Sequence, residues 1–194
     1  MPFFSSLPDD AGVRHILRLH PAAGRALIEF HTAVLREDSQ LTAGDKELIA
    51  AYVSGLNGCQ YCFGVHQETA KAFGVDESVL MALLEDVEQA PVDPRLRPML
   101  VYARQLTLAP SKATQKDVDA VFAAGWTERD LHDAILTVCL FNFMNRLLDG
   151  HGVKGTSALH EERGRALKDT GYSALLAMLD DATVQPSRDA RSPS

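Results

Sequence analysis

The chain has 194 residues, of which 46% are hydrophobic and 23% charged, a composition that predicts one soluble globular domain with a substantial core. The net charge of −7 argues against broad nucleic-acid binding, because phosphate contacts need clustered lysine and arginine. The N-terminal sequence MPFFSSLPDD does not resemble a signal peptide, and no apolar run is long enough to span a bilayer. We therefore expect a cytoplasmic protein with neither a membrane segment nor a nucleic-acid partner.

Helical periodicity and helix-terminal residues predict an all-α chain, since the alternating β-branched runs typical of strands are missing. Pro21 and Thr42 are suited to start helices, and Asn57-Gly58 is suited to end one. The expected helices are 10–19, 22–36, 42–57, 59–73, 76–85, 95–108, 114–124, 127–148 and 156–179, the last with a break near Gly171. The domain is predicted to cover residues 1–184, with a flexible polar tail at 185–194.

One cluster of residues has the composition of a reaction centre. Cys59-Gln60-Tyr61-Cys62 is followed by His66, and Glu47 precedes it in an amphipathic run. Both cysteines fall in the first turn of a predicted helix, where unpaired N–H groups and the helix dipole favour a thiolate. Their spacing places the thiols on one face, close enough for a disulfide, with His66 one turn further along. Glu47 could fold back across the intervening turn to hold the imidazole, which would complete a set of nucleophile, resolving thiol, base and orienting acid.

Other uses of a CxxC pair can be weighed against the same residues. Covalent haem attachment needs a histidine directly after the second cysteine, where this chain has Phe63. A thioredoxin-like site needs a preceding strand, and none is predicted. Zinc remains an alternative, because Cys59, Cys62 and His66 supply three ligands and Glu47 could be the fourth.

The third cysteine, Cys139, lies in an apolar run and is expected to be a small buried hydrophobic residue. The run around it, Val138-Cys-Leu-Phe-Asn-Phe-Met, could belong either to the core or to an interface between subunits.

Glu47, eleven intervening residues and then Cys-x-x-Cys-x-x-x-His resemble the motif of the AhpD/carboxymuconolactone decarboxylase superfamily. The closest resemblance is to its branch of alkylhydroperoxidase AhpD-like or peroxidase-related proteins. The similarity is strongest over residues 42–75, and Asn145-Arg146 with the following HGV stretch also resembles this branch. The resemblance implies an AhpD-like helical bundle with the CxxC motif at the N-terminus of a central helix. It also implies a homo-oligomer (trimer, hexamer or dimer) that works without a bound metal or cofactor.

The resemblance further implies a peroxidase cycle that uses a hydroperoxide substrate and a thiol reductant. Cys62 would attack the hydroperoxide and become a sulfenic acid, Cys59 would resolve it to a disulfide, and Glu47 and His66 would relay the proton. Tyr61 stands where AhpD has a further relay histidine, and it is expected either to pack against a neighbouring subunit or to hydrogen-bond a substrate oxygen. Decarboxylation is not expected, because the true carboxymuconolactone decarboxylases lack the thiol pair. Two alternatives stay open: a thiol-disulfide oxidoreductase or redox sensor acting on a protein partner, and a zinc-binding assembly module.

Overall fold

The computed structural model describes residues 1–180, which form ten α-helices and one short 3-10 helix and contain no β-strand. No helix in this range is both long and apolar enough to cross a membrane. The predicted all-α class is therefore confirmed, whereas the tail predicted at 185–194 and the last four residues of the predicted domain lie outside the described range. The elements are α1 (Val13–Leu19), α2 (Pro21–Arg36), α3 (Ala43–Leu56), α4 (Gln60–Ala72), α5 (Glu77–Glu85), α6 (Arg97–Leu108), η1 (Pro110–Lys112), α7 (Gln115–Ala123), α8 (Glu128–Gly150), α9 (Ser157–Thr170) and α10 (Ala174–Asp180).

The helix boundaries follow local chemistry, and the start of the first helix differs from expectation. The first helix begins at Val13 rather than at residue 10, because Gly12 is its N-cap and donates its N–H to the side chain of His15 at 3.0 Å. The break expected near Gly171 is present, because Gly171 adopts a φ of +66° that ends α9 and separates it from α10. Other ends were predicted closely, as Thr42 caps α3 by accepting from the N–H of Asp45 at 3.1 Å.

α3 is the helix most completely enclosed by the rest of the fold. Every residue from Lys46 to Ser54 is buried, so this helix has no solvent face. α4 instead buries one stripe, formed by Tyr61, Cys62, Val65, His66, Thr69 and Ala70 at helical spacing. Between the two helices Gly58 takes a φ of +72°, which a side chain would oppose, and this tight turn lays α4 back along α3.

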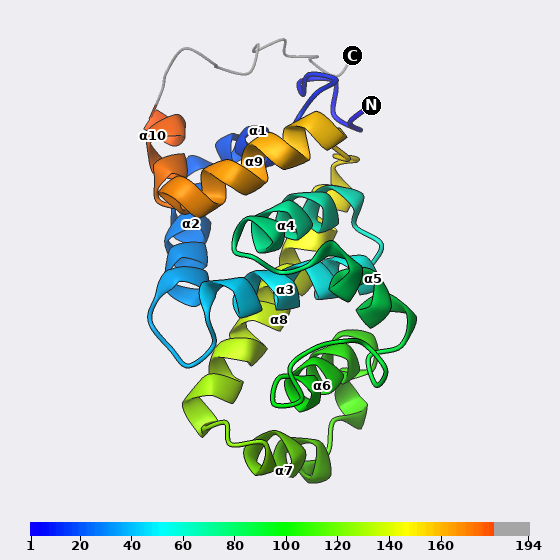
Figure 1. Ribbon diagram of the computed structural model, residues 1–194. Helices are drawn as coiled ribbons and strands as arrows, with labels where there is room; N and C mark the ends of the chain where they lie inside the picture. Colours follow the sequence, from blue (N-terminus) through cyan, green and yellow to red (C-terminus); the bar gives the residue numbers. More distant parts are fainter. Residues whose placement is uncertain (181–194) are drawn as a thin grey trace.

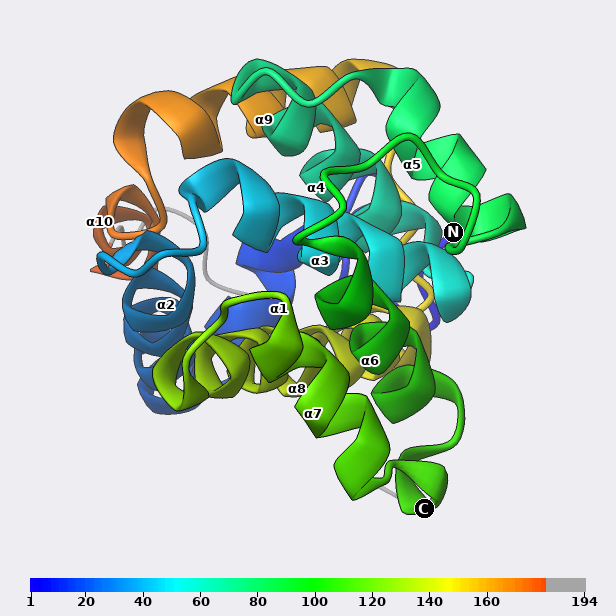
Figure 2. The same ribbon diagram turned by 60° about the horizontal axis from the view of Figure 1, so that its bottom comes forward.

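The helices are arranged so that α4 lies between α3 and α9, and it packs against both (Figure 1). The long α8 runs behind this group and packs against α3, α2 and α6 (Figure 1). Figures 1 and 2 agree in placing α9 and α10 at one end of the molecule and α6 and α7 at the other. The thiol motif therefore lies within the end of the molecule that α9 and α10 cover.

The expectation that Cys139 is buried is wrong. Along α8 the core-facing positions include Val138 and Phe141, and the helical rotation places Cys139 on the outer face, where it is exposed. Phe143, four residues later, is 50% exposed on the same helix. An apolar run in the sequence thus contributes to both faces of α8.

Candidate active site

Glu47 is the centre of a buried hydrogen-bond network. Its side chain is fully buried on α3, and its Oε2 accepts from His66 Nδ1 at 2.7 Å, so the contact expected across the α3–α4 turn is present. Its Oε1 accepts from Arg36 Nη2 at 2.6 Å and from the Tyr172 hydroxyl at 2.9 Å. Burial alone would raise the pKa of Glu47, but the charges and hydrogen bonds of His66 and Arg36 outweigh it and lower the pKa. Glu47 is therefore a carboxylate at neutral pH.

His66 is oriented by this carboxylate. Because an ionised carboxylate only accepts hydrogen bonds, Nδ1 of His66 carries the proton and Nε2 is left to exchange one. The ring is held in place by Phe141, which meets it edge-on with ring centroids 4.4 Å apart, and it stacks over Tyr172 at 6.5 Å. Such fixed orientation suits a group that must move a proton at a defined position.

Cys59 and Cys62 form a hydrogen-bonded pair of free thiols. Cys59 is the N-cap residue of α4 and fully buried, whereas Cys62 lies in the first turn and is 3% exposed. The hydrogen bond to Cys59, and then burial, raise the pKa of Cys62 well above its ordinary value, although the side chain of Asn145 acts in the opposite direction. The same hydrogen bond lowers the pKa of Cys59. The two thiols therefore titrate together, with the pKa of Cys59 lowered and the pKa of Cys62 raised.

Asn145, on α8, connects the thiols to the end of α3. Besides its bond to Cys62, its Nδ2 donates to Ser54 Oγ at 2.9 Å and its Oδ1 accepts from Asn57 Nδ2 at 2.8 Å. An amide with its donor and acceptor both engaged holds a fixed orientation, so the bond that it offers to Cys62 is fixed as well.

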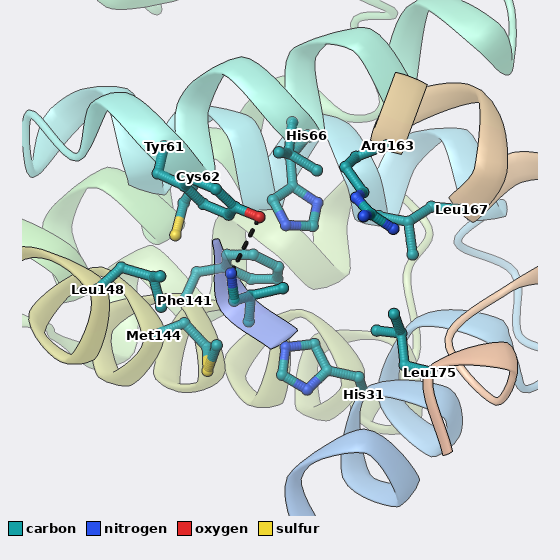
Figure 3. Close-up of a pocket in the computed structure, with 12 residues that line it drawn as sticks. His31, Tyr61, Cys62, His66, Phe141, Met144, Leu148, Arg163, Leu167 and Leu175 are labelled. Atoms are coloured by element: carbon teal, nitrogen blue, oxygen red, sulfur yellow. Dashed lines mark hydrogen bonds between the residues drawn. The ribbon is translucent and has the colours of Figure 1, made fainter. Parts of the chain in front are cut away.

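The side chains of Cys62 and His66 line one small cavity of about 50 Å³ (Figure 3). The walls of the cavity are mainly apolar and come from α1, α2, α4, α8, α9 and α10. The other residues that line it are Val13, His31, Tyr61, Val65, Phe141, Met144, Leu148, Arg163, Leu167 and Leu175. Cys59 does not line it. A reagent in this cavity would therefore meet Cys62 and His66 before it met Cys59.

Tyr61 closes part of this cavity. Its hydroxyl accepts from the N–H of Val13 at 3.1 Å, a bond drawn in Figure 3, and burial raises its pKa. Its ring meets His160 edge-on with centroids 6.0 Å apart. This geometry favours a packing role for Tyr61, but the elements that it contacts are α1 and α9 of its own chain rather than the expected neighbouring subunit.

The zinc alternative receives no support from this arrangement. Within residues 1–180 no group of three or more His, Cys, Asp or Glu side chains is placed to hold a metal ion. Glu47, the fourth ligand considered, already accepts hydrogen bonds from three side chains.

Several residues of the site gave no signal in the sequence. Tyr172 is 125 positions from its partner Glu47, and Arg36 reaches the same carboxylate from α2. Asn145 belongs to the part of the sequence that resembles the family, but no spacing indicates that it would contact a thiol. Only the packing of α2, α8 and the segment before α10 around α3 and α4 brings these side chains together.

Fold and site together define an all-helical protein with a buried dithiol next to a glutamate–histidine pair. Residues 21–105 match the Carboxymuconolactone decarboxylase family, and this segment contains Glu47, Cys59, Cys62 and His66. An uncharacterized peroxidase-related protein of Ralstonia eutropha JMP134, described as an alkylhydroperoxidase AhpD core, is 26% identical with a TM-score of 0.70. That match covers 77% of this chain and 78% of the other.

Two further relatives extend the comparison. An uncharacterized peroxidase-related protein of Silicibacter sp. TM1040 is 25% identical with a TM-score of 0.71, and the match covers 79% of this chain and 80% of the other. The uncharacterized protein YdfG of Bacillus subtilis (strain 168) is 26% identical over 121 residues, which are 62% of this chain and 82% of that protein. Together these matches confirm the predicted resemblance and support assignment of the chain to the AhpD-like/carboxymuconolactone decarboxylase superfamily.

Proposed function

We propose that the protein is a thiol-dependent peroxidase that reduces hydroperoxides through Cys59 and Cys62. The observation that carries this proposal is the cavity that Cys62 shares with His66. Nδ1 of this histidine is hydrogen-bonded to the buried carboxylate of Glu47. A dithiol supplies two electrons, and a carboxylate-supported imidazole can store and return the proton that the reaction moves. The names of the two solved relatives, both peroxidase-related, agree with this chemistry.

Cavity access decides which sulfur attacks. Cys62 and His66 both face the cavity, so the Cys62 thiol passes its proton to Nε2 of His66, which leaves a thiolate on Cys62 and an imidazolium at His66. The Cys62 thiolate then attacks the terminal oxygen of the hydroperoxide. A sulfur–oxygen bond forms, the O–O bond breaks, and the alkoxide that leaves takes a proton from the His66 imidazolium. The products are a Cys62 sulfenic acid and an alcohol.

The second step closes the disulfide. Cys59, still a thiol, loses its proton to the neutral His66 and attacks the Cys62 sulfur. Hydroxide leaves, and it becomes water with the proton that His66 returns. The sum of the two steps is two thiols and one hydroperoxide converted to a disulfide, an alcohol and water. An external thiol reductant must then restore the pair, and no metal or organic cofactor enters this cycle.

Burial distinguishes this proposal from a thiol-disulfide oxidoreductase that acts on another protein. Cys59 is fully buried and Cys62 is 3% exposed, so a folded protein disulfide cannot reach either sulfur without an opening of the fold. A cavity of about 50 Å³ has room for about three or four water molecules, which matches a small hydroperoxide. Size therefore favours a peroxide over a protein as the oxidant.

The proposal is tested by adding peroxide to the reduced protein and following peroxide loss and protein mass. The wild type should consume peroxide and lose about 2 Da as the disulfide forms. Cys62→Ser should abolish both, whereas Cys59→Ser should stop at a sulfenic acid that a sulfenic-acid-specific reagent traps. Cys139→Ser is the matched control, because this exposed cysteine lies outside the cavity and its loss should change nothing. Unchanged peroxide consumption in Cys62→Ser would refute the assignment of the nucleophile.

Assembly into a homo-oligomer belongs to the same proposal. Phe30 on α2 and Phe143 on α8 are 41% and 50% exposed, and a subunit interface would bury these large apolar side chains. Light scattering on the eluting protein gives the mass directly. A monomer at all concentrations would contradict this part of the proposal.

A further inference from the structure

His31 is a buried polar side chain of the cavity that the cycle above does not use. It lies on α2, is 7% exposed, and lines the same cavity as Cys62 and His66. Figure 3 shows Cys62 and His66 entering the cavity from α4, while the ring of His31 enters from α2 on the opposite side. A molecule in the cavity would therefore lie between the thiol and this second imidazole.

The protonation of His31 is fixed by its own helix. Nδ1 lies 2.7 Å from the carbonyl oxygen of Leu27, and since a carbonyl only accepts, Nδ1 carries the hydrogen. Nε2, on the edge of the ring away from Nδ1, is then an acceptor with a free lone pair. Burial, the largest influence, lowers the pKa of His31 to about 4, so the ring is neutral at physiological pH.

The His31 ring lies next to two aromatic side chains. The His31 ring lies 5.2 Å from the ring of Tyr172 and 6.1 Å, edge-on, from that of Phe141. Among residues 1–180 the hydrogen bond found for this imidazole is the one to Leu27. A buried acceptor of this kind favours a ligand that brings a hydrogen-bond donor into the cavity.

We propose that Nε2 of His31 accepts the O–H of the hydroperoxide and thereby positions the terminal oxygen for attack by Cys62. This inference rests on the proposed peroxidase function and narrows its substrates to peroxides that carry an O–H, namely hydrogen peroxide and alkyl hydroperoxides. The terminal oxygen is the one that bears the hydrogen and the one that the thiolate attacks. After attack the hydrogen remains on that oxygen as S–O–H and can stay bonded to His31.

The two histidines thereby take different roles for a structural reason. His66 donates to the Glu47 carboxylate, which supports a positive charge on its ring, so it can hold the thiol proton. His31 donates to a neutral carbonyl and works as a neutral acceptor. His31 is therefore a positioning residue for the substrate, and His66 is the residue that exchanges the proton.

The experiment compares two reagents on the reduced full-length protein. Hydrogen peroxide carries O–H donors, whereas methyl methanethiosulfonate is a small thiol reagent with neither an O–H nor an N–H. His31→Phe keeps a ring between Tyr172 and Phe141 but removes the acceptor. It should lower the second-order rate constant for peroxide by about tenfold to thirtyfold and leave the rate of methanethiosulfonate modification of Cys62 within about twofold. His31→Gln, which restores an acceptor, should recover part of the peroxide rate.

His151→Phe is the matched control. Its Nδ1 makes the same bond to the carbonyl four residues earlier, Leu147 O at 2.7 Å, but His151 does not line the cavity. Its replacement should leave both rates unchanged. If His31→Phe does not unfold cooperatively, His31→Leu takes its place, because it too lacks an acceptor.

Three outcomes overturn the inference. Equal loss of both rates in His31→Phe would show that the ring acts on the thiols or on packing, and no loss of the peroxide rate would show that it does not bind the peroxide. In both cases the peroxidase function itself would stand. A wild-type protein whose Cys62 reacts with methanethiosulfonate but not with peroxide would instead refute the proposed function and this inference with it.

Discussion

Replacement of Glu47 by glutamine tests the site at its centre. The two side chains have nearly the same shape, so the change removes the negative charge and converts one acceptor into an N–H donor. In the wild type both carboxylate oxygens are acceptors, one for His66 and the other for Arg36 and Tyr172. The amide can satisfy one side of this network, and its NH₂ group then faces a donor on the other side.

The expected loss of rate follows from the bond to His66. A hydrogen bond to a charged group contributes about 1.5–3 kcal/mol, and the imidazolium that forms when the thiol proton is transferred loses that support in Glu47→Gln. Since 1.4 kcal/mol corresponds to a factor of ten, the rate constant for oxidation by peroxide at pH 7 should fall by about tenfold to a hundredfold. The fall should be in the rate of the first oxidation step, because the proton transfer precedes attack.

The free energy of unfolding should also be lower in Glu47→Gln than in the wild type, by an amount that depends on pH. Loss of one partner of a buried ion pair costs about 3–5 kcal/mol, and because the Arg36 side chain is 17% exposed we expect about 2–3 kcal/mol for Glu47→Gln at neutral pH. The folded-state pKa of Glu47 is lowered below its ordinary value of 4.5, so its contribution is complete above about pH 4.5 and is lost as the pH falls through the folded pKa. The difference in unfolding free energy between wild type and variant should therefore shrink in acid.

Stopped-flow measurement of peroxide oxidation, with urea unfolding at pH 7 and pH 4, provides the assay. Asp133→Asn is the matched control, because Asp133 is a carboxylate with 8% side-chain exposure that pairs with Arg129 on α8, away from the cavity. It should leave the peroxide rate unchanged. A folded Glu47→Gln protein with the wild-type peroxide rate would refute the proton relay.

Three further predictions concern the thiols, the packing and the substrate. Asn145→Leu removes a hydrogen bond that lowers the pKa of Cys62, so the thiolate absorbance should appear at higher pH. The rate of oxidation by peroxide at pH 7 should fall severalfold. An unchanged thiol titration curve would contradict this role of Asn145. Gly164→Ala should lower the free energy of unfolding by about 1–3 kcal/mol, because the new Cβ would lie 2.5 Å from the Cβ of Glu68 and force α9 away from α4. Gly150→Ala is the control, because the space around Gly150 is open. In the same urea titration it should be neutral or stabilising by up to about 1 kcal/mol. Oxidation rates should decrease from hydrogen peroxide through tert-butyl to cumene hydroperoxide as the substrate outgrows a cavity of about 50 Å³, and faster reaction with cumene hydroperoxide would show that the cavity opens.

Features that depend on local chemistry could be predicted from the amino-acid sequence. Helical spacing, Thr42 as a cap and Gly171 as a breaker predicted where helices begin and end, because these effects act within a turn or two of the chain. The thiol motif was equally local, since the α4 helix holds Cys59 and Cys62 three residues apart. Even the contact between Glu47 and His66 could be expected, because a tight turn joins the two helices that carry them.

Side-chain contacts between distant helices, and the exposure of individual residues, depend on how the helices pack and could not be predicted from the sequence. Arg36, Asn145 and Tyr172 reach the site from three other parts of the chain, and no spacing in the sequence encodes those meetings. The exposure of Cys139 was mispredicted because an apolar run does not reveal which of its residues face outward once the helix is packed. No sequence pattern indicates a role for His31, because it is a lone histidine on an amphipathic helix. Only the packing of α2 across the cavity from α4 places its free nitrogen opposite a thiol.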